Sequence, residues 1–337
     1  MSDVPKVRNI SDLARIAGVS PGTVSRALSD AGLISQKTRD RIKALAREHD
    51  FRPNILARNL RIQKTGAIGV LIPLGHETGQ HISDPFFITM LGLLADELTE
   101  RGYDLMLSRV IPTDADWLSR FVESGRVDGV IVIGQSDQSA TLDQVASRYR
   151  PLVVWGGYNM GQIHCSVGSD NRAGGEMAAA HLIARGCTRI AFFGDPLALE
   201  IRQRLEGCQL ALEKAGLGDQ LSILPAHLVA NASDPDIAGF LSSENSRPQG
   251  ILAASDVIAM STLRILSELG FSVPADVRVI GFDGLALGEQ TVPRLSTIKQ
   301  DLTTGVHNLV DLLLRRIAGE DTGSVVMPPE LIVRMSS

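Results

Sequence analysis

The first fifty residues contain three short segments in which apolar residues recur with the period of a helix. In the first segment the apolar face consists of Ile10, Leu13, Ala14 and Ala17. We expect Ser11 to cap this helix and Gly18 to end it, because glycine readily adopts the left-handed conformation. A second helix is expected from Pro21 to about Leu28 after a cap at Ser20, and a third is expected after Ser35.

Three short helices with a tight glycine turn predict an all-α helix-turn-helix domain over residues 1–52. The second helix of such a domain lies in the major groove of DNA, with its N-terminal residues toward the base edges. The residues expected to contact DNA from this helix are Ser20, Pro21, Gly22, Thr23, Ser25 and Arg26. Arg26 suits either guanine or a phosphate, whereas Thr23 and Ser25 are better suited to phosphate oxygens.

From residue 65 onward, short apolar strands alternate with amphipathic helices. The expected strands are 67–72, 103–107, 129–133, 151–155, 189–193, 250–254 and 277–282. The expected helices include 86–101, 171–185, 201–215 and 256–269. This alternation predicts an α/β fold whose parallel sheets are covered on both faces, and the number of strands predicts two sheets in two lobes.

Charge is distributed unevenly along the 337 residues. Residues 1–64 carry 13 lysines and arginines against six acidic residues, whereas the remaining 273 residues carry 20 basic and 32 acidic residues. A cationic head on an acidic body favours contact with a polyanion such as DNA. The alternative is an ordinary solvated surface.

The sequence also indicates the cellular compartment in which the protein is expected. Its start lacks the apolar stretch of a signal peptide, and no segment approaches the ~18 apolar residues of a membrane helix. Cys165, Cys187 and Cys208 are an odd number without metal-ligand spacing. These features predict a cytoplasmic protein with reduced thiols and no membrane contact.

Two motifs resemble a catalytic or a metal site. Residues 18–22 fit the G-x-S-x-G pattern of a hydrolase nucleophile, but that chemistry needs a strand before the serine. A helix is expected there, so Ser20 is interpreted as a cap. His76, Glu77 and His81 lie on a glycine-interrupted loop without the helical spacing of a zinc site. No catalytic residue, metal or cofactor is therefore predicted, and we do not expect an enzyme.

Three linked stretches resemble the lactose-repressor (LacI/GalR-type) family of transcriptional regulators. They are residues 9–28, 35–42 and 51–61, and the similarity continues through the body. The resemblance implies a homodimer that binds pseudo-palindromic, double-stranded operator DNA under the control of a small ligand. Pro21 and Gly22 stand at the family's two variable base-reading positions, and neither offers a side-chain hydrogen bond.

The same resemblance implies that residues 53–64 form a hinge helix, which pairs with its dimer mate in the minor groove. The hinge residues that it places at DNA are Asn54, Ala57, Arg58, Leu60 and Arg61. Leu60 would be wedged between base steps, while the two arginines suit phosphates. The alternative is an ordinary linker with Leu60 packed on the body.

For residues 65–337 the resemblance implies a type I periplasmic-binding-protein-like domain that binds the effector and forms the dimer. Its N-lobe would comprise about 65–167 and 299–325, and its C-lobe about 168–296 and 327–337. Chain crossings are expected near residues 166–170, 296–300 and 324–328. The loops at the strand ends would point into the cleft between the lobes.

The resemblance places nine residues at the effector, namely Asp84, Phe86, Phe87, Trp155, Glu200, Arg204, Asp234, Ser255 and Asp283. Arg204 and Asp283, from opposite sides of the cleft, would form a polar clamp for a polyol; a local salt bridge is the alternative. An aromatic ring can stack on the C–H face of a sugar, although one of Phe86 and Phe87 is expected to be core.

The polar character of these residues favours a neutral carbohydrate, such as an α-glucoside, and hence a repressor of carbohydrate-utilisation genes. A purine or another metabolite is the second candidate. Two other classes were weighed. A solute-binding protein would share the body but not the basic head, and an architectural DNA-binding protein would have no use for a large cleft.

Overall fold

The computed structural model describes residues 7, 9–28, 34–51, 64–74, 79–135, 137–229, 232–243 and 247–337. The chain divides into two compact units, Met1–Thr65 and Gly66–Ser337, which are described separately. The five hinge residues predicted at DNA, Asn54, Ala57, Arg58, Leu60 and Arg61, lie outside the described residues.

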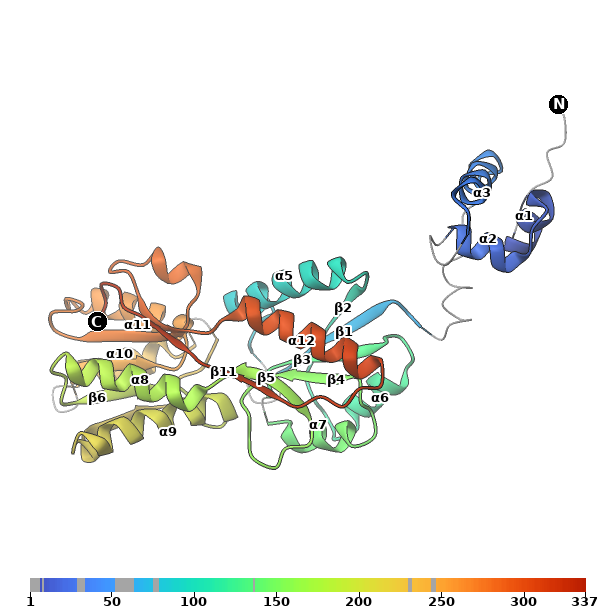
Figure 1. The fold of residues 1–337 in the computed structure, drawn as a ribbon. Helices are drawn as coiled ribbons and strands as arrows, with labels where there is room; N and C mark the ends of the chain where they lie inside the picture. The colour runs from blue at the N-terminus through green and yellow to red at the C-terminus, as the bar shows by residue number, and fades with distance from the viewer. Residues whose placement is uncertain are drawn as a thin grey trace. The chain divides into compact units, whose positions relative to one another are not determined.

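The first unit is the predicted helix-turn-helix domain, which confirms the expected fold (Figure 1). Its helices are α1 (Ile10–Ala17), α2 (Pro21–Leu28) and α3 (Gln36–Glu48). The side chains at the centre of its core are Leu13, Val24, Ala27 and Ile42. Gly18 ends α1 with a φ of 63°, a left-handed conformation that glycine adopts without steric cost. Arg41 of α3 donates a hydrogen bond of 2.8 Å to the Ala17 carbonyl, which joins α3 to the end of α1.

The start of α1 differs from the prediction. Asn9, not Ser11, is the N-cap, because its side chain accepts a hydrogen bond of 2.9 Å from the Asp12 backbone nitrogen. Ile10 already lies inside the helix, so Ser11 occupies the first turn. Both residue types suit a cap, and the sequence alone did not decide between them.

The second unit contains two six-stranded sheets. The first sheet is entirely parallel, in the order β11-β5-β4-β3-β1-β2. Its strands are β1 (Ala67–Pro73), β2 (Asp104–Val110), β3 (Gly129–Ile133), β4 (Leu152–Trp155), β5 (Cys165–Ser169) and β11 (Val325–Met327). Helices α5 (Pro85–Glu100) and α12 (Leu302–Ile317) cover one face. Helices α6 (Trp117–Glu123) and α7 (Ser139–Ala146) cover the other.

Alternation along a strand accounts for this two-sided burial. Ile131 and Ile133 of β3 belong to the apolar core beneath α5 and α12, while Val130 and Val132 belong to the core beneath α6 and α7. Successive side chains of a strand point to opposite faces, so a strand covered on both faces is apolar throughout. This is why β3 was recognisable as a continuous apolar run.

The second sheet has the order β12-β10-β9-β8-β6-β7, and all its pairs are parallel except the antiparallel pair β10–β12. Its strands are β6 (Ile190–Phe193), β7 (Leu221–Leu224), β8 (Gly250–Ala253), β9 (Arg278–Asp283), β10 (Ser296–Lys299) and β12 (Glu330–Ile332). The helices of this lobe are α8 (Asn171–Ala184), α9 (Leu199–Lys214), α10 (Asp234–Ser242) and α11 (Asp256–Glu268), with short 3₁₀ turns at η1 (Gly218–Gln220) and η3 (Ala286–Glu289).

Helices α8 and α9 approach so closely that their backbones touch (Figure 1). A Cβ atom at Gly175 of α8 would lie 2.0 Å from the carbonyl oxygen of Arg204 in α9. A Cβ atom at Gly207 of α9 would lie 1.9 Å from the carbonyl oxygen of Arg172 in α8. Both positions therefore require glycine, and their contact sets the position of Arg204.

The chain passes between the two sheets three times: after β5, after β10 and between β11 and β12. These passes fall close to the three expected crossings. As a result α12 packs with the first sheet, although it follows the second sheet in sequence. Within the described ranges, no helix is long and apolar enough to cross a membrane.

Candidate functional site

A cavity lies between the two lobes of the second unit and is open to solvent; the empty space within its bounds, open solvent included, is about 840 Å³. Its walls are formed where strands of both sheets end, which is where open parallel sheets bind ligands. Of the nine residues predicted at the ligand, those that line the cavity are Asp84, Phe86, Phe87, Trp155, Glu200, Arg204, Ser255 and Asp283. Eight of the nine predicted residues therefore line the cavity.

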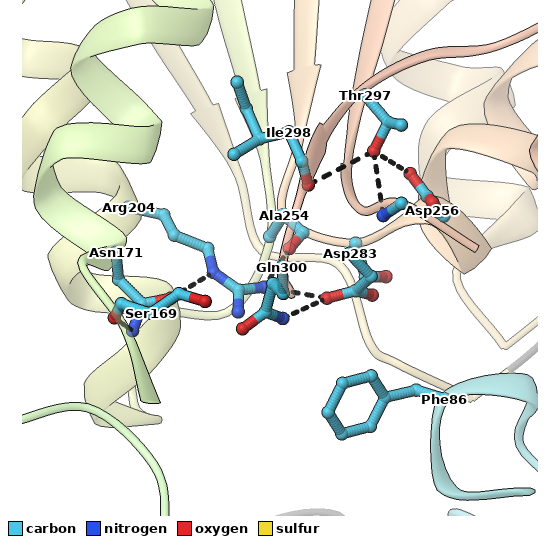
Figure 2. Close-up of polar contacts among 12 residues, drawn as sticks. Phe86, Ser169, Asn171, Arg204, Ala254, Asp256, Asp283, Thr297, Ile298 and Gln300 are labelled. Carbon is cyan, nitrogen blue, oxygen red and sulfur yellow. Dashed lines mark hydrogen bonds and ion pairs between the residues drawn. The ribbon is translucent and has the colours of Figure 1, made fainter. Parts of the chain in front are cut away.

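Arg204 and Asp283 form the polar centre of the cavity (Figure 2). Arg204 Nη1 lies 3.8 Å from Asp283 Oδ1, and both side chains are buried. The guanidinium also donates to Asn171 Oδ1 at 2.8 Å and to the Ala254 carbonyl at 2.5 Å, and it stacks 3.8 Å from the centre of the Phe282 ring. Burial lowers the pKa of Arg204, but the pKa of arginine is so high that the group stays charged.

The prediction that Arg204 and Asp283 face each other from opposite sides of the cleft is wrong. Arg204 lies on α9 and Asp283 ends β9, and both elements belong to the lobe of the second sheet. They form an ion pair within one lobe, but the pair is buried in the cavity wall and does not lie on the lobe surface. The facing wall consists instead of aromatic residues from the first lobe.

Asp283 is held in an unusual conformation. Its φ is 122°, which residues other than glycine rarely adopt. Gln300, directly after β10, donates a hydrogen bond of 2.8 Å to Asp283 Oδ1. Burial raises the pKa of Asp283 to about 6, while the positive charge of Arg204 opposes the rise. Strain and burial of a carboxylate at a cavity wall are typical of a binding residue.

A second buried carboxylate, Asp256, supports the turn that carries Asp283. Its Oδ1 accepts from Thr297 Oγ1 at 2.6 Å, and its Oδ2 accepts from the Leu285 backbone nitrogen at 2.7 Å (Figure 2). Burial and the nearby Asp283 raise the pKa of Asp256 to about 8. Asp256 thus fixes the backbone that follows Asp283 without lining the cavity itself.

The first lobe contributes an aromatic wall. Phe86 is half-buried and lies opposite Asp283 and Gln300 (Figure 2). Its ring centre is 5.9 Å from that of Phe87 and 6.5 Å from that of Trp155. Phe87 and Trp155 belong mainly to the core, since they are only 7% and 5% exposed. Phe86 is therefore the ring best placed to stack on a ligand.

Asp84 has a structural role beside this wall. Its side chain caps α5 by accepting a hydrogen bond of 2.9 Å from the Phe86 backbone nitrogen. Gln80 donates to its other carboxylate oxygen at 3.3 Å. Burial raises the pKa of Asp84, which lies near Asp283. The cap orients the first turn of α5 and with it Phe86.

Glu200 connects the two lobes. Its Oε1 accepts a hydrogen bond of 3.1 Å from the Gly157 nitrogen, and Gln203 on the same helix donates 2.8 Å to the Tyr158 carbonyl. A Cβ atom at Gly156 would lie 2.7 Å from Glu200 Oε1. Glycine at residue 156 therefore leaves room for Glu200 in the cavity.

Asp234 does not belong to the cavity, so its prediction as a ligand residue is not supported. It begins α10 and pairs with Arg264 of α11, away from the cavity wall. Ser255 does line the cavity, but its hydroxyl also caps α11 by accepting from the Ile258 nitrogen at 3.3 Å. A polar residue in a loop after a strand can serve a helix start instead of a ligand, and sequence does not separate these roles.

The polar side chains of the cavity wall that were not predicted are Gln80, Ser169, Asn171 and Gln300. Ser169 ends β5, and its buried hydroxyl has no hydrogen-bond partner among the described residues. Ser169 and Gln300 stand where the chain passes between the lobes. Reading every strand end and every crossing for polar residues would have found both.

In the first unit, α2 presents the predicted DNA-contacting residues on the face opposite its buried Val24 and Ala27. Ser20, Pro21, Gly22 and Arg26 are exposed, and Thr23 and Ser25 are half-buried. Ser20 Oγ accepts from the Thr23 backbone nitrogen at 3.2 Å, as a helix cap does. Arg26 Nε donates 3.2 Å to the Gly22 carbonyl, which holds the guanidinium along the exposed face.

Neither metal-ligand nor thiol chemistry is built into the described residues. They contain no group of three or more histidines, cysteines or carboxylates that could hold a metal, and His76 and Glu77 lie outside them. The three cysteines are free and buried. Burial raises the pKa of Cys208 to about 12, which suppresses the reactive thiolate.

Two protein-family models match the chain. Residues 9–54 match the model of bacterial regulatory proteins of the lacI family, and residues 179–337 match a periplasmic binding protein-like domain. Two curated relatives cover nearly the whole length. The sucrose operon repressor of Streptococcus mutans is 30% identical over 94% of this chain and 95% of its own. The transcriptional repressor PurR of Haemophilus influenzae is 27% identical over 97% and 98%.

Solved structures agree with this similarity. A lac repressor dimer bound to operator and the anti-inducer ONPF superposes with a TM-score of 0.83, with 26% identity over 98% of this chain and 99% of the other. The complex of the transcriptional regulator CelR with cellobiose gives a TM-score of 0.69, with 26% identity over 98% and 100%.

Proposed function

Because the chain belongs to the LacI family of DNA-binding repressors, which are not enzymes, we propose that its effector-binding domain responds to a carbohydrate in the interlobe cavity. A disaccharide containing an α-glucoside is the candidate we favour, and carbohydrate-utilisation genes are the proposed targets. One observation carries the proposal: the half-buried ring of Phe86 faces the hydrogen-bonding groups of Asp283 and Gln300 across the cavity. Sugars present an apolar C–H face and a rim of hydroxyls, which suits these two walls.

Charge favours a neutral ligand over an anionic one. Arg204 already pairs with Asp283 and donates to Asn171 and Ala254, so its positive charge is compensated within the protein. Glu200 and Asp84 add negative charge to the same cavity. A phosphorylated or acidic metabolite would therefore meet repulsion there.

The relatives support a sugar but leave a second candidate. One relative represses a sucrose operon, and CelR was solved with cellobiose. Another relative is the repressor PurR, so a purine is the alternative effector. An aromatic wall with Asp283 opposite could also hold a flat heterocycle, since a carboxylate accepts hydrogen bonds from ring nitrogens.

For DNA recognition, the proposal is a homodimer on a pseudo-palindromic operator, as helix-turn-helix dimers bind two half-sites. Residues 1–52 form the DNA-binding domain, 53–64 the hinge and 65–337 the effector and dimer domain in this proposal. The N-lobe comprises about 65–167 and 299–325, and the C-lobe about 168–296 and 327–337. Effector binding changes operator affinity by favouring one arrangement of the lobes.

Calorimetry on the full chain tests the effector. Sucrose, maltose, cellobiose, ribose, hypoxanthine and guanine would be titrated separately, followed by operator binding with and without each ligand that binds. Saturable binding of a sugar that changes operator affinity supports the proposal. Binding of hypoxanthine or guanine with no response to any of the sugars would establish the purine alternative.

A further inference from the structure

The first residue of the effector-binding unit is held by two neighbouring strands. Gly66 donates its backbone N–H to Asp128 Oδ2 at 2.9 Å, and its carbonyl accepts from the Asp104 nitrogen at 2.8 Å. Asp128 in turn donates its own backbone N–H to the Ala67 carbonyl at 2.8 Å. The chain therefore enters β1 through a small clamp formed at the start of β2 and β3.

This clamp lies at the amino ends of the strands, opposite the cavity at their carboxyl ends. β1 is paired on both sides, with Ala67 opposite Asp104 and Ile68 opposite Gly129. The sheet itself is therefore fixed as far as Ala67. Gly66 precedes the strand. Its N–H donates to the side chain of Asp128, whereas the residues of β1 are held by backbone hydrogen bonds to β2 and β3.

Gly66 needs such an anchor. Its φ is 75°, and glycine can leave this conformation more easily than any other residue because it has no Cβ. Without the Asp128 carboxylate, the bond that fixes its N–H would be lost, and only the bond from the Asp104 nitrogen to its carbonyl would still restrain the backbone at Gly66. This residue is also the boundary between the two compact units, Met1–Thr65 and Gly66–Ser337.

We propose that Asp128 is a positioning residue for operator binding, which fixes the backbone at Gly66 where the chain passes from the DNA-binding unit to the body. Asp128 is not among the residues that line the cavity. The inference rests on the function of the family as DNA-binding repressors and is independent of the identity of the effector. Loss of the clamp adds backbone freedom at the boundary, and operator binding must then overcome that added entropy.

The test compares the full-length chain with Asp128→Ala, Asp128→Asn and Asp116→Ala. The asparagine variant retains an amide oxygen that can accept from Gly66. Asp116 is an exposed residue of the same lobe whose side chain makes no helix-capping hydrogen bond, so its variant controls for the loss of one negative charge. The DNA probe is a duplex selected by the wild-type protein from a randomised library.

Operator affinity is measured by fluorescence anisotropy at fixed salt without any effector, and hydrogen exchange is followed at the Gly66 amide. Asp128→Ala should speed exchange at Gly66 at least tenfold and raise the operator Kd about five- to tenfold, in line with the loss of one hydrogen bond. Asp128→Asn should stay within about twofold of the wild type in operator Kd, and Asp116→Ala should be unchanged.

The proposal is overturned if Asp128→Ala speeds exchange at Gly66 yet binds the operator as tightly as the wild type. It is equally overturned if Asp116→Ala or Asp128→Asn loses as much affinity as Asp128→Ala, because charge would then be the cause. If Asp128→Ala does not fold, Asp128→Ser takes its place, since the shorter side chain does not reach Gly66. Failure of every sugar to bind would leave these measurements intact.

Discussion

Asp283 combines three properties that rarely occur in one residue: a strained backbone, a buried side chain and a place in a cavity wall. Backbone strain and the burial of a carboxylate both destabilise the folded protein, and such features concentrate at sites where the charged group interacts with a ligand. Since burial raises its pKa to about 6, the ionised form of Asp283 is lost at a higher pH than for an exposed aspartate. Ligand binding that uses the carboxylate should therefore weaken at mildly acidic pH.

We expect the Kd of the effector to rise about tenfold between pH 7 and pH 5, because the ionised fraction of a group with a pKa near 6 falls by that factor. Calorimetry across this range measures the change. Asp283→Asn should bind more weakly at pH 7, with a Kd that hardly varies with pH, and should bind operator as the wild type does. An unaltered pH profile in Asp283→Asn would assign the titration to another group.

The cap of α1 gives a second prediction at this scale. Asn9→Ala removes the hydrogen bond to the Asp12 nitrogen and should destabilise the first unit by about 1 kcal/mol. Ser11→Ala lies within the helix and should change stability by no more than about 0.5 kcal/mol. Hydrogen exchange of the α1 amides in the full chain distinguishes the two variants. Equal effects would mean that the cap at Asn9 contributes nothing specific.

The sequence predicted which motif residues line the cavity, but not whether each of them contacts a ligand, forms an ion pair or caps a helix. Arg204 and Asp283 were identified correctly as cavity residues, yet they were placed on opposite walls, although the predicted C-lobe of about 168–296 contains both and the sheet order agrees with that lobe. Asp234 and Ser255 occupy similar loop positions, and only the packing of α10 and α11 separates an ion pair with Arg264 from a place in the wall. Such distinctions depend on tertiary contacts that no local pattern encodes.

Among the elements, the contact of α8 with α9 controls where Arg204 lies. Gly175→Ala should push the two helices apart, since its Cβ would lie 2.0 Å from the Arg204 carbonyl. Overpacking of this kind costs about 1–3 kcal/mol or more. We expect a lower free energy of unfolding, measured by urea denaturation, together with a weaker response to the effector.

A matched glycine serves as the control. Gly239 is exposed in the middle of α10, and a Cβ atom there would meet nothing within 4 Å. Gly239→Ala should therefore stabilise the protein by about 0.5–1 kcal/mol, because alanine is the better helix former. If Gly175→Ala were as stable as Gly239→Ala, the helices would have to separate without cost, which contradicts their close packing.

Continuous apolar runs and clear helical periodicity gave the best predictions. Strands β1, β3, β4, β6, β8 and β9 and helices α5, α8 and α11 lie within one or two residues of their expected ranges. Strand β2 extends three residues beyond its expected end, and strands β5, β7, β10, β11 and β12 were not individually predicted. These five strands either contain polar residues or have only three residues, so they carry little apolar pattern, and their pairing is decided by strands distant in sequence.

At the scale of the whole molecule, the uneven distribution of charge matches the expected separation of DNA binding from effector binding. The net charge of residues 1–64 is positive and that of the remainder is negative. Operator affinity should fall steeply with salt concentration, since cationic side chains displace counterions from phosphates. The residues 66–337 expressed alone should bind the effector with the affinity of the full chain and should not bind the operator.

Anisotropy at 50, 100 and 200 mM salt and calorimetry on both proteins measure these expectations. Arg26→Ala should reduce the slope of log K against log salt by about 1 if Arg26 contacts a phosphate. If it reads guanine instead, specificity at one base pair should relax. If residues 66–337 bound the operator as tightly as the full chain, DNA binding would not depend on residues 1–65, and the expected separation of the two functions would be refuted.

The chain passes between the two sheets three times, and this topology affects the order in which the lobes can be completed during translation. Helix α12 and strand β11 complete the first lobe, yet they are translated only after strands β6 to β10 of the second sheet. About 280 residues separate the end of α3 from the end of β11, which takes about 15–55 s to translate at roughly 5–20 residues per second. During synthesis the three helices of the first unit are therefore translated well before the first lobe can be completed, so the early part of that lobe has to wait for α12 and β11 to cover and extend its sheet.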